Sequence, residues 1–495
     1  MLGSFFSLAS ALALAMVASV SAQDGAVCGG LVTDGMEGTF NVKYNGITFT
    51  VLTINGLNNN KWSNESYVLY CTETPLNDTQ LQGLNLPPGI SQFKVPVQSV
   101  LVEGTYTSSY VELAGGRTQI KVLEDPLNIV SPCLQAQVKN GSIVALNGQP
   151  EQYNGIDVGF RIKEDRSQAK DVWVPMSVEV VPLLRVEYIK AISLFFNNGN
   201  QATLTYEKIK RTYDNLSMDM RRIPKDKKKR IGWVKYDFTR GSWTLQNSAF
   251  TKGIITDADV TDNADISPSD FKILVSNADV IIDQTEFNGK KGGEIDKLSY
   301  WRKLAGFTDA KDPPVLDKKQ VYSLDNTVNM NTVSDYLYRM PSRPDLLLRD
   351  VIKAQYPEYD LNYTFQFLNE KFLYGDEVSN RLGPENCDMG DTLTPFPYNS
   401  GDITETPLNP SFHGDPYGPP ALIGGGIYGA GGDSQGGDAS GGGGSKTKNI
   451  IIAVVSVAAI LGAAFAFAFY KWSRRAKEDR FIELEEEMNN EIPLN

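Results

Sequence analysis

Histidine is almost absent from this 495-residue chain, and its four cysteines do not have the spacing of a metal site. The single histidine, His413, lies in a segment rich in proline and glycine. A Ser-His-Asp triad needs a histidine within the folded domain, and imidazole is a common ligand of bare transition metals. The sequence therefore argues against triad catalysis and against a metal held by imidazole.

Motifs of the common hydrolases, nucleotide-binding enzymes and metalloproteases are also absent. The chain has no Gly-x-Ser-x-Gly elbow, no Walker loop and no His-Glu-x-x-His. The run Gly-Lys-Lys-Gly-Gly at residues 289–293 lacks the spacing of a phosphate loop and is interpreted as a polar turn. Hydrolysis by two facing carboxylates leaves no such motif and stays open as an alternative. We expect a protein that is not an enzyme and has no bound cofactor.

An excess of positive charge is missing as well, since the formal net charge is -12. Nucleic acids select basic surfaces, so nucleic acid is not an expected partner. The basic run at residues 225–230 is interpreted as a solvated linker.

Apolar segments at the two ends indicate a membrane protein of the secretory pathway. Residues 1–22 are uncharged and end in Val-Ser-Ala, which suits a cleaved signal peptide, with an uncleaved helix as the alternative. Residues 450–470 are apolar and, at about 1.5 Å per residue, would span the roughly 30 Å hydrocarbon core. Basic residues follow, so residues 471–495 should form a cytoplasmic tail, which a removable glycolipid anchor would lack. We predict a single-pass type I protein, at the cell surface or in an endomembrane, with an extracellular or lumenal ectodomain.

The four cysteines all lie in this predicted ectodomain. An even number in an oxidising compartment suggests two disulfides, and four cysteines allow three connectivities. The pairing that we favour joins Cys71 to Cys133 within one lobe and Cys28 to Cys387 between the ends of the ectodomain.

Five Asn-x-Ser/Thr sequons lie between the signal and the anchor. Each marks an expected surface position if the chain passes through a glycosylating secretory system. The sequon asparagines are Asn64, Asn77, Asn140, Asn215 and Asn362.

Residues 23–181 are predicted to form an N-terminal lobe of short strands. The expected strands share β-branched and aromatic residues and end at glycine, asparagine or proline. A helix should open at residues 107–109, where hydroxyl side chains suit an N-cap, and end at the glycines 115–116. The expected strands are residues 41–44, 47–52, 67–70, 95–101 and 119–123.

Residues 182–224 form the next predicted unit, a helical connector, because apolar residues recur there at helical spacing with one break at residues 197–200. Residues 225–357 should form a C-terminal lobe in which strands and helices alternate, which favours an α/β fold with a mainly parallel sheet. The expected elements of this lobe are strands 231–236, 278–283 and 320–324 and helices 267–277, 297–304 and 343–356.

Residues 358–449 are predicted to be a stalk between the lobes and the membrane. Proline, glycine, asparagine and aspartate dominate its middle, and glycine dominates residues 424–445. Such a composition gives a flexible linker that forms no core.

Two lobes joined by a helix resemble the class III periplasmic solute-binding proteins, which deliver cobalamin, ferric siderophores and haem to importers. The resemblance is carried by Pro-Leu-Leu-Arg-Val-Glu-Tyr-Ile-Lys at 182–190, Ala-Asp-Val-Ile-Ile-Asp at 278–283 and Arg-Pro-Asp-Leu-Leu-Leu at 343–348. It implies a two-lobed ectodomain that closes on a small ligand. The membrane anchor and the sequons depart from the bacterial pattern, so the chain resembles a eukaryotic, anchored relative, and an importer or endocytic partner stays open.

In a two-lobed protein of this kind, ligand is expected at the carboxyl ends of the strands that face the cleft. Hydroxyl, amide and carboxylate groups would orient it and aromatic rings would pack on it. Each candidate also has a structural interpretation as a helix cap, turn or core residue. The candidates are Thr72, Glu73, Thr74, Thr107, Ser108, Ser109 and Tyr110 from the first lobe, and Tyr236, Asp237, Trp243, Asp283, Gln284, Thr285, Asp325 and Asn326 from the second.

The leading hypothesis is a cell-surface receptor that captures a metal chelate or cofactor, namely a ferric siderophore, haem or cobalamin, for iron uptake or related transport. The alternative is an adhesion or structural surface glycoprotein that keeps the fold without a ligand. A filled cleft would favour the alternative, and two facing acidic residues would favour a glycosidase.

Overall fold

The computed structural model describes residues 27–58, 61–147, 150–162, 170–176, 181–246, 251, 265–285, 297–307, 311–370, 373 and 380–387. The predicted signal peptide, most of the stalk, the predicted membrane helix and the tail lie outside these ranges. Within them, no helix has the length and apolar character needed to cross a membrane.

The first lobe contains two sheets. A four-stranded sheet has the order β1-β2-β3-β4, and a five-stranded sheet with the order β7-β6-β5-β8-β9 is parallel throughout. Its strands are β1 (Phe40–Asn45), β2 (Phe49–Asn58), β3 (Lys61–Tyr70), β4 (Gln92–Lys94), β5 (Val100–Val102), β6 (Ile120–Leu123), β7 (Val144–Ala145), β8 (Val158–Arg161) and β9 (Asp171–Trp173). Its helices are η1 (Met36–Gly38), α2 (Asp78–Gly83), α3 (Thr105–Leu113), η2 (Arg117–Gln119), η3 (Pro126–Asn128), α4 (Pro132–Lys139) and η4 (Pro150–Tyr153).

The predicted strand at residues 95–101 is wrong as a single element. The chain instead has β4 and β5 on either side of a cis Val95–Pro96 peptide bond. Proline has no backbone N–H to donate to a strand ladder, so it separates the two sheets.

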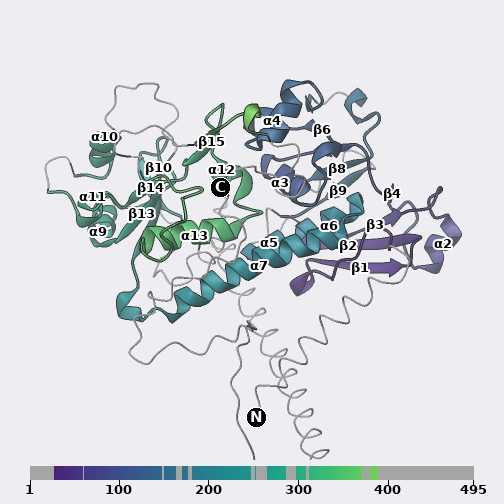
Figure 1. Ribbon diagram of the computed structural model, residues 1–495, viewed down its shortest axis with the longest axis horizontal. Helices are drawn as coiled ribbons and strands as arrows, with labels where there is room; N and C mark the ends of the chain where they lie inside the picture. The colour runs from purple at the N-terminus through teal and green to yellow at the C-terminus, as the bar shows by residue number, and fades with distance from the viewer. Residues whose placement is uncertain are drawn as a thin grey trace, which may run out of the picture. The chain divides into compact units, whose positions relative to one another are not determined.

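The connector consists of α5 (Pro182–Val186), α6 (Tyr188–Ser193), η5 (Leu194–Phe196) and α7 (Gly199–Arg222), followed by η6 (Lys225–Lys227). Asn197 has a left-handed backbone, with φ 56°, and ends the first part. The break predicted at this position is therefore present. Figure 1 shows α7 running from the elements of the first lobe to those of the second.

The second lobe is built on a five-stranded sheet with the order β12-β11-β10-β13-β14, in which β10, β13 and β14 are parallel. β11 pairs antiparallel with both β10 and β12, so the sheet is mixed, and the predicted parallel arrangement holds for β10, β13 and β14. Its strands are β10 (Ile231–Asp237), β11 (Ser242–Leu245), β12 (Asp265–Ile266), β13 (Val280–Asp283) and β14 (Val321–Ser323), beside a small parallel pair, β15 (Thr327–Asn329) and β16 (Asn380–Leu382). Its helices are α9 (Pro268–Asn277), α10 (Lys297–Leu304), α11 (Pro314–Asp317), α12 (Asp335–Arg339) and α13 (Pro344–Gln355), and η7 (Pro384–Asn386) follows β16 and packs on α4 of the first lobe.

The second lobe continues beyond residue 357, where the sequence predicts the start of the stalk. Phe367 and Leu368 are fully buried in its core. The Asp350 carboxylate accepts hydrogen bonds from the backbone N–H groups of Gln366, Phe367 and Leu368, at 2.6 to 3.2 Å. A buried acceptor on α13 therefore fixes a segment whose composition resembles a linker.

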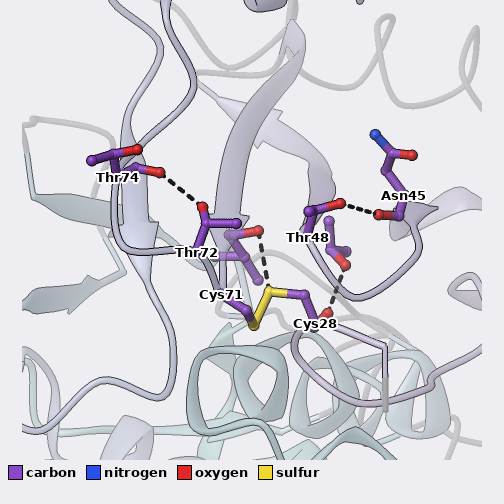
Figure 2. The surroundings of a disulfide bond; sticks show 8 residues. Cys28, Asn45, Thr48, Cys71, Thr72 and Thr74 are labelled. Carbon is purple, nitrogen blue, oxygen red and sulfur yellow. Dashed lines mark hydrogen bonds between the residues drawn. A yellow bond between two sulfur atoms is a disulfide. The ribbon is translucent and has the colours of Figure 1, made fainter. Parts of the chain in front are cut away.

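The disulfide pairing favoured from the sequence is wrong. Cys28 is bonded to Cys71, which ties the N-terminal segment to the end of β3 (Figure 2). Cys133 on α4 is bonded to Cys387, and their Cα atoms lie 4.6 Å apart. The chain returns to the first lobe after β16, and the sequence offers no spacing from which this return could be predicted.

Candidate solute-binding site between the two lobes

The carboxyl ends of parallel strands, β5, β6 and β8 in the first lobe and β10, β13 and β14 in the second, define where a ligand is expected. Loops from both lobes follow these ends. The described residues in them fall into three groups: those that join the lobes, those buried within one lobe, and those on other surfaces.

Ser109 and Tyr110 join the lobes. The Ser109 hydroxyl is 2.9 Å from the Ser342 hydroxyl, and the Tyr110 hydroxyl donates to the carbonyl oxygen of Pro341 at 2.6 Å. Both side chains are buried, and α3 packs against α12. This part of the predicted cleft is therefore filled by protein.

The hydroxyls of residues 107–109 are not the N-cap that the sequence predicts. The helix begins two residues earlier, after Gly104, whose φ is 79°. Ser108 and Ser109 donate to the carbonyl oxygens of Thr105 and Tyr106. Their hydroxyls therefore bond back onto the helix, as is common within helices.

A buried carboxylate extends the contact between the lobes. Glu112 accepts hydrogen bonds from Arg117 Nε at 3.0 Å and Ser131 Oγ at 2.7 Å within the first lobe, and from the Tyr338 hydroxyl of α12 at 2.8 Å. Burial raises the pKa of Glu112, while Arg117 and the hydroxyl donors oppose the rise. Replacing any of these partners would leave a buried polar group unsatisfied.

Asn329 makes a further bridge, at the carboxyl ends of β6 and β15. Its Nδ2 donates to the carbonyl oxygens of Leu127 and Ile129 at 2.8 and 2.9 Å. Gln135 on α4 donates to the carbonyl oxygen of Leu382 at 3.1 Å, close to the Cys133–Cys387 disulfide. Hydrogen bonds and a covalent bond thus hold the β6 side of the first lobe to the second.

Thr72, Glu73 and Thr74 lie on another surface. They follow β3 in the four-stranded sheet, and all three are exposed. Thr72 bonds locally to Thr74 beside the Cys28–Cys71 disulfide (Figure 2). Glu73 pairs with Lys94 at 2.9 Å. The structure does not bring them to α3 and α12.

The aromatic candidates of the second lobe belong to its core. Trp243 is 2% exposed, stacks on Phe271 with ring centroids 4.0 Å apart, and donates from Nε1 to the carbonyl oxygen of Leu304. Tyr236 packs edge-on against Trp243. The core interpretation holds for Trp243, and its indole N–H has a partner within the lobe.

Asp283 ends β13 and is buried. It accepts hydrogen bonds from the Thr285 backbone N–H at 2.8 Å, from the Thr285 hydroxyl, and from Trp301 Nε1 at 2.8 Å. Burial raises the pKa of Asp283 to about 6, against the effect of these donors. Asp283 and Thr285 therefore support the strand end, and Thr285 also accepts from the Tyr236 backbone N–H.

The other candidates of the second lobe also have partners inside it. Gln284 donates to the Tyr336 hydroxyl at 3.2 Å, and Asn326 donates to the carbonyl oxygen of Phe365 at 2.6 Å. Asp325 accepts from Asn369 at 3.1 Å. Asp237 forms a turn with Arg240, whose guanidinium lowers the pKa of Asp237 to about 2.

A charged cluster at the first lobe's sheet was missed from the sequence. Arg161 ends β8 and pairs with Asp171 at 2.7 Å and with Glu103, which follows β5, at 3.6 Å. Its Nη2 also donates to the Tyr153 hydroxyl at 3.0 Å. The signal for it was a charged residue directly after each of two short apolar strands, Val100–Val102 and Val158–Phe160.

Nine buried side-chain nitrogen and oxygen atoms have no hydrogen-bond partner within the part of the chain that the structure describes, and two of them lie at the amino end of α3. They are Oε2 of Glu103 and the hydroxyl oxygen of Thr107. Both residues lie on the stretch where β5 passes into α3. An unmade hydrogen bond at a buried polar atom costs about 1–3 kcal/mol, so each such atom calls for an explanation, such as strain, a water, an ion or a ligand.

The raised pKa of Asp283 predicts that acid stabilises the second lobe. Between its ordinary pKa near 4 and about 6, the folded state holds a proton that the unfolded state has lost, so the free energy of unfolding falls as the pH rises through this window. Asp283→Asn cannot titrate and should show a smaller fall between pH 4 and 6. Urea unfolding across this range, against wild type, is the measurement, and equal slopes in the two proteins would contradict the prediction.

Comparison with known proteins gave matches only among solved structures. No family model matches the chain, and a search of curated proteins found no match. A periplasmic binding protein from Veillonella parvula is 12% identical over 62% of this chain and 92% of its own, with a TM-score of 0.42. The periplasmic vitamin B12 binding protein of Vibrio cholerae is 12% identical over 52% and 97%, with a TM-score of 0.35. An iron uptake transporter substrate-binding protein from Streptococcus pneumoniae is 11% identical over 52% and 93%, with a TM-score of 0.36.

All three are binding proteins, of which one is named for vitamin B12 and one for iron uptake, and a further match is a siderophore binding protein, so the neighbours are of the kind that the sequence resembles. The identities and TM-scores are too low to transfer a ligand or an activity to this chain. Any function has to be argued from its own residues.

Proposed function

We propose that this chain is an anchored surface protein that binds a small solute, a metal chelate such as a ferric siderophore, haem or cobalamin, without transforming it. The observation that supports this proposal best is the pair of buried, unpaired polar atoms on Glu103 and Thr107. They lie where a parallel sheet passes into a helix, which is where α/β proteins commonly place ligands. A solute with hydrogen-bond donors would satisfy the Glu103 oxygen.

The proposed mode of binding differs from the closing cleft that the resemblance implies. Tyr338, Asn329 and the Cys133–Cys387 disulfide already join the lobes. Hinge closure would have to break several buried hydrogen bonds, each costing about 1–3 kcal/mol. We therefore propose that ligand binds at the first lobe's sheet while the lobes keep their arrangement.

A thermal-shift screen of the soluble ectodomain against ferric siderophores, haem and cobalamin tests capture. Ligand at a hundredfold its dissociation constant should add about 2.7 kcal/mol to the stability. Glu103→Gln keeps the size of the side chain but changes the oxygen that lacks a partner, so it should reduce the shift. Glu73→Gln, on the exposed loop of the other sheet, is the matched control and should keep the shift.

The absence of a shift with all three classes, from folded wild-type protein, would overturn capture. If Glu103→Gln leaves the thermal shift unchanged, the protein captures the ligand, but at a site that does not involve Glu103. The two failures can therefore be told apart.

A second candidate is an adhesion or structural surface glycoprotein with a fixed arrangement of lobes. The filled contact of Ser109 and Tyr110 with residues 341–342 favours it. All five sequon asparagines are exposed, as surface glycans require. This function predicts one narrow distance distribution between spin labels on the two lobes, unchanged by any of the ligands, together with no thermal shift.

A further inference from the structure

The route of the chain after the second lobe has a mechanical consequence. β16 pairs with β15 of the second lobe, and Asn380 N–H donates to the carbonyl oxygen of Asn326. Leu382 is then buried among side chains of the first lobe's core, and η7 packs on α4. Cys387, directly after η7, is bonded to Cys133. The last described segment therefore begins on the second lobe, with β16, and ends on the first lobe, with Cys387.

The Cys133–Cys387 bond closes a covalent loop with a sequence separation of 254 residues. This loop contains the connector and the whole second lobe. The Cys28–Cys71 bond closes a separate loop, with a separation of 43 residues, around the first strands. A pull applied to the two ends of the chain would pass through both disulfides and would bypass everything inside the loops.

We propose that the Cys133–Cys387 disulfide is a force clamp, which passes tension on the C-terminal flank into α4 and keeps the second lobe and the connector free of load. The physiological source of tension rests on the proposed anchoring beyond residue 387, since an anchored ectodomain that holds a partner or ligand is pulled from that side. Ser109, Tyr110 and Glu112 lie in the segment between Cys71 and Cys133, which carries the load, whereas their partners Ser342, Pro341 and Tyr338 lie inside the large closed loop and are outside the covalent load path.

Single-molecule pulling of the full chain tests the clamp, with one handle placed just before Val27 and the other at the C-terminal end. Under oxidising conditions, wild type should not release the large loop. The double variant Cys133→Ser/Cys387→Ser should release an additional length of about 840 to 910 Å, because each extended residue adds about 3.3–3.6 Å and the separation is 254. The matched control, Cys28→Ser/Cys71→Ser, should add only about 140 to 155 Å for its separation of 43.

Disulfide mapping of the same sample by non-reducing digestion separates the outcomes. Release of the large loop from wild type would overturn the clamp, whether mapping finds the bond absent or finds it intact. Retention of the loop in wild type and release in the double variant would support it. The screen for chelates has no bearing on this result, so the clamp and the proposed capture fail independently.

Discussion

Replacing both cysteines of the second disulfide, as Cys133→Ser/Cys387→Ser, should destabilise the ectodomain more than opening the first disulfide does. Closing a loop of 254 residues removes conformational entropy from the unfolded chain, which in the chain-entropy model is worth about 5.5 kcal/mol at 25 °C. The double variant avoids a free thiol. Its midpoint of unfolding in urea, compared with that of wild type under non-reducing conditions, measures the loss.

The other disulfide gives the matched comparison. Cys28→Ser/Cys71→Ser opens a loop of 43 residues, for which the same model gives about 4 kcal/mol. The larger loop should therefore cost about 1.5 kcal/mol more. A smaller loss for the Cys133–Cys387 variant would show that the covalent bond adds little to the contacts of Gln135 and Asn329, which already hold the same parts together.

Local sequence patterns predicted the regular elements of the connector and the second lobe better than those of the first lobe, where β8, β9 and α4 were missed. Helix α10 has the predicted bounds, and α9 begins one residue after the predicted start, because Ser267 is its N-cap and accepts a hydrogen bond from the Asp270 backbone N–H. These features depend on residues a few positions apart. The parallel order of β10, β13 and β14 followed from the alternation of strands with helices, which needs a crossover between parallel neighbours.

Contacts between distant residues could not be predicted in this way. The pairing of Cys133 with Cys387 depends on the return of the chain after β16, and nothing near either cysteine marks it. The contact between α3 and α12 depends on which face of each helix meets the other lobe. Serine and tyrosine at residues 109–110 suit a ligand or a protein partner equally well, and the structure gives them a protein partner.

At the candidate site, too, the sequence predicted positions near strand ends but not which of them have partners within the fold. Placing ligand residues at the carboxyl ends of strands led to Asp283 and Asn326, whose polar groups are used within the second lobe. The same rule, applied to the short strands β5 and β8, would have found Glu103 and Arg161. Those strands were harder to recognise because three or four residues give too little alternation to be distinguished from a loop.

The polar composition of residues 358–370 predicts a linker, and Asp350 explains why they fold instead. Its carboxylate, on α13, accepts from the Tyr363 hydroxyl at 2.6 Å and from three consecutive backbone N–H groups at residues 366–368. These donors would otherwise be buried without acceptors beside Phe367, which is fully buried. One side chain thus takes the place that a neighbouring strand would have in a sheet.

Asp350→Ala should therefore lower the free energy of unfolding by about 4 kcal/mol, because it leaves several buried donors without an acceptor, each at a cost of about 1–3 kcal/mol. Asp350→Asn should cost much less. Its carbonyl oxygen can replace the carboxylate oxygen that accepts from residues 366–368, and its amide can donate to the Tyr363 hydroxyl. The asparagine also removes a charge that is costly to bury, since burial raises the pKa of Asp350 to about 6. Urea unfolding at pH 7 measures both variants, and hydrogen exchange at residues 366–368 locates the effect. Equal losses in the two variants would mean that the charge, rather than its hydrogen-bond acceptors, holds this segment on the lobe.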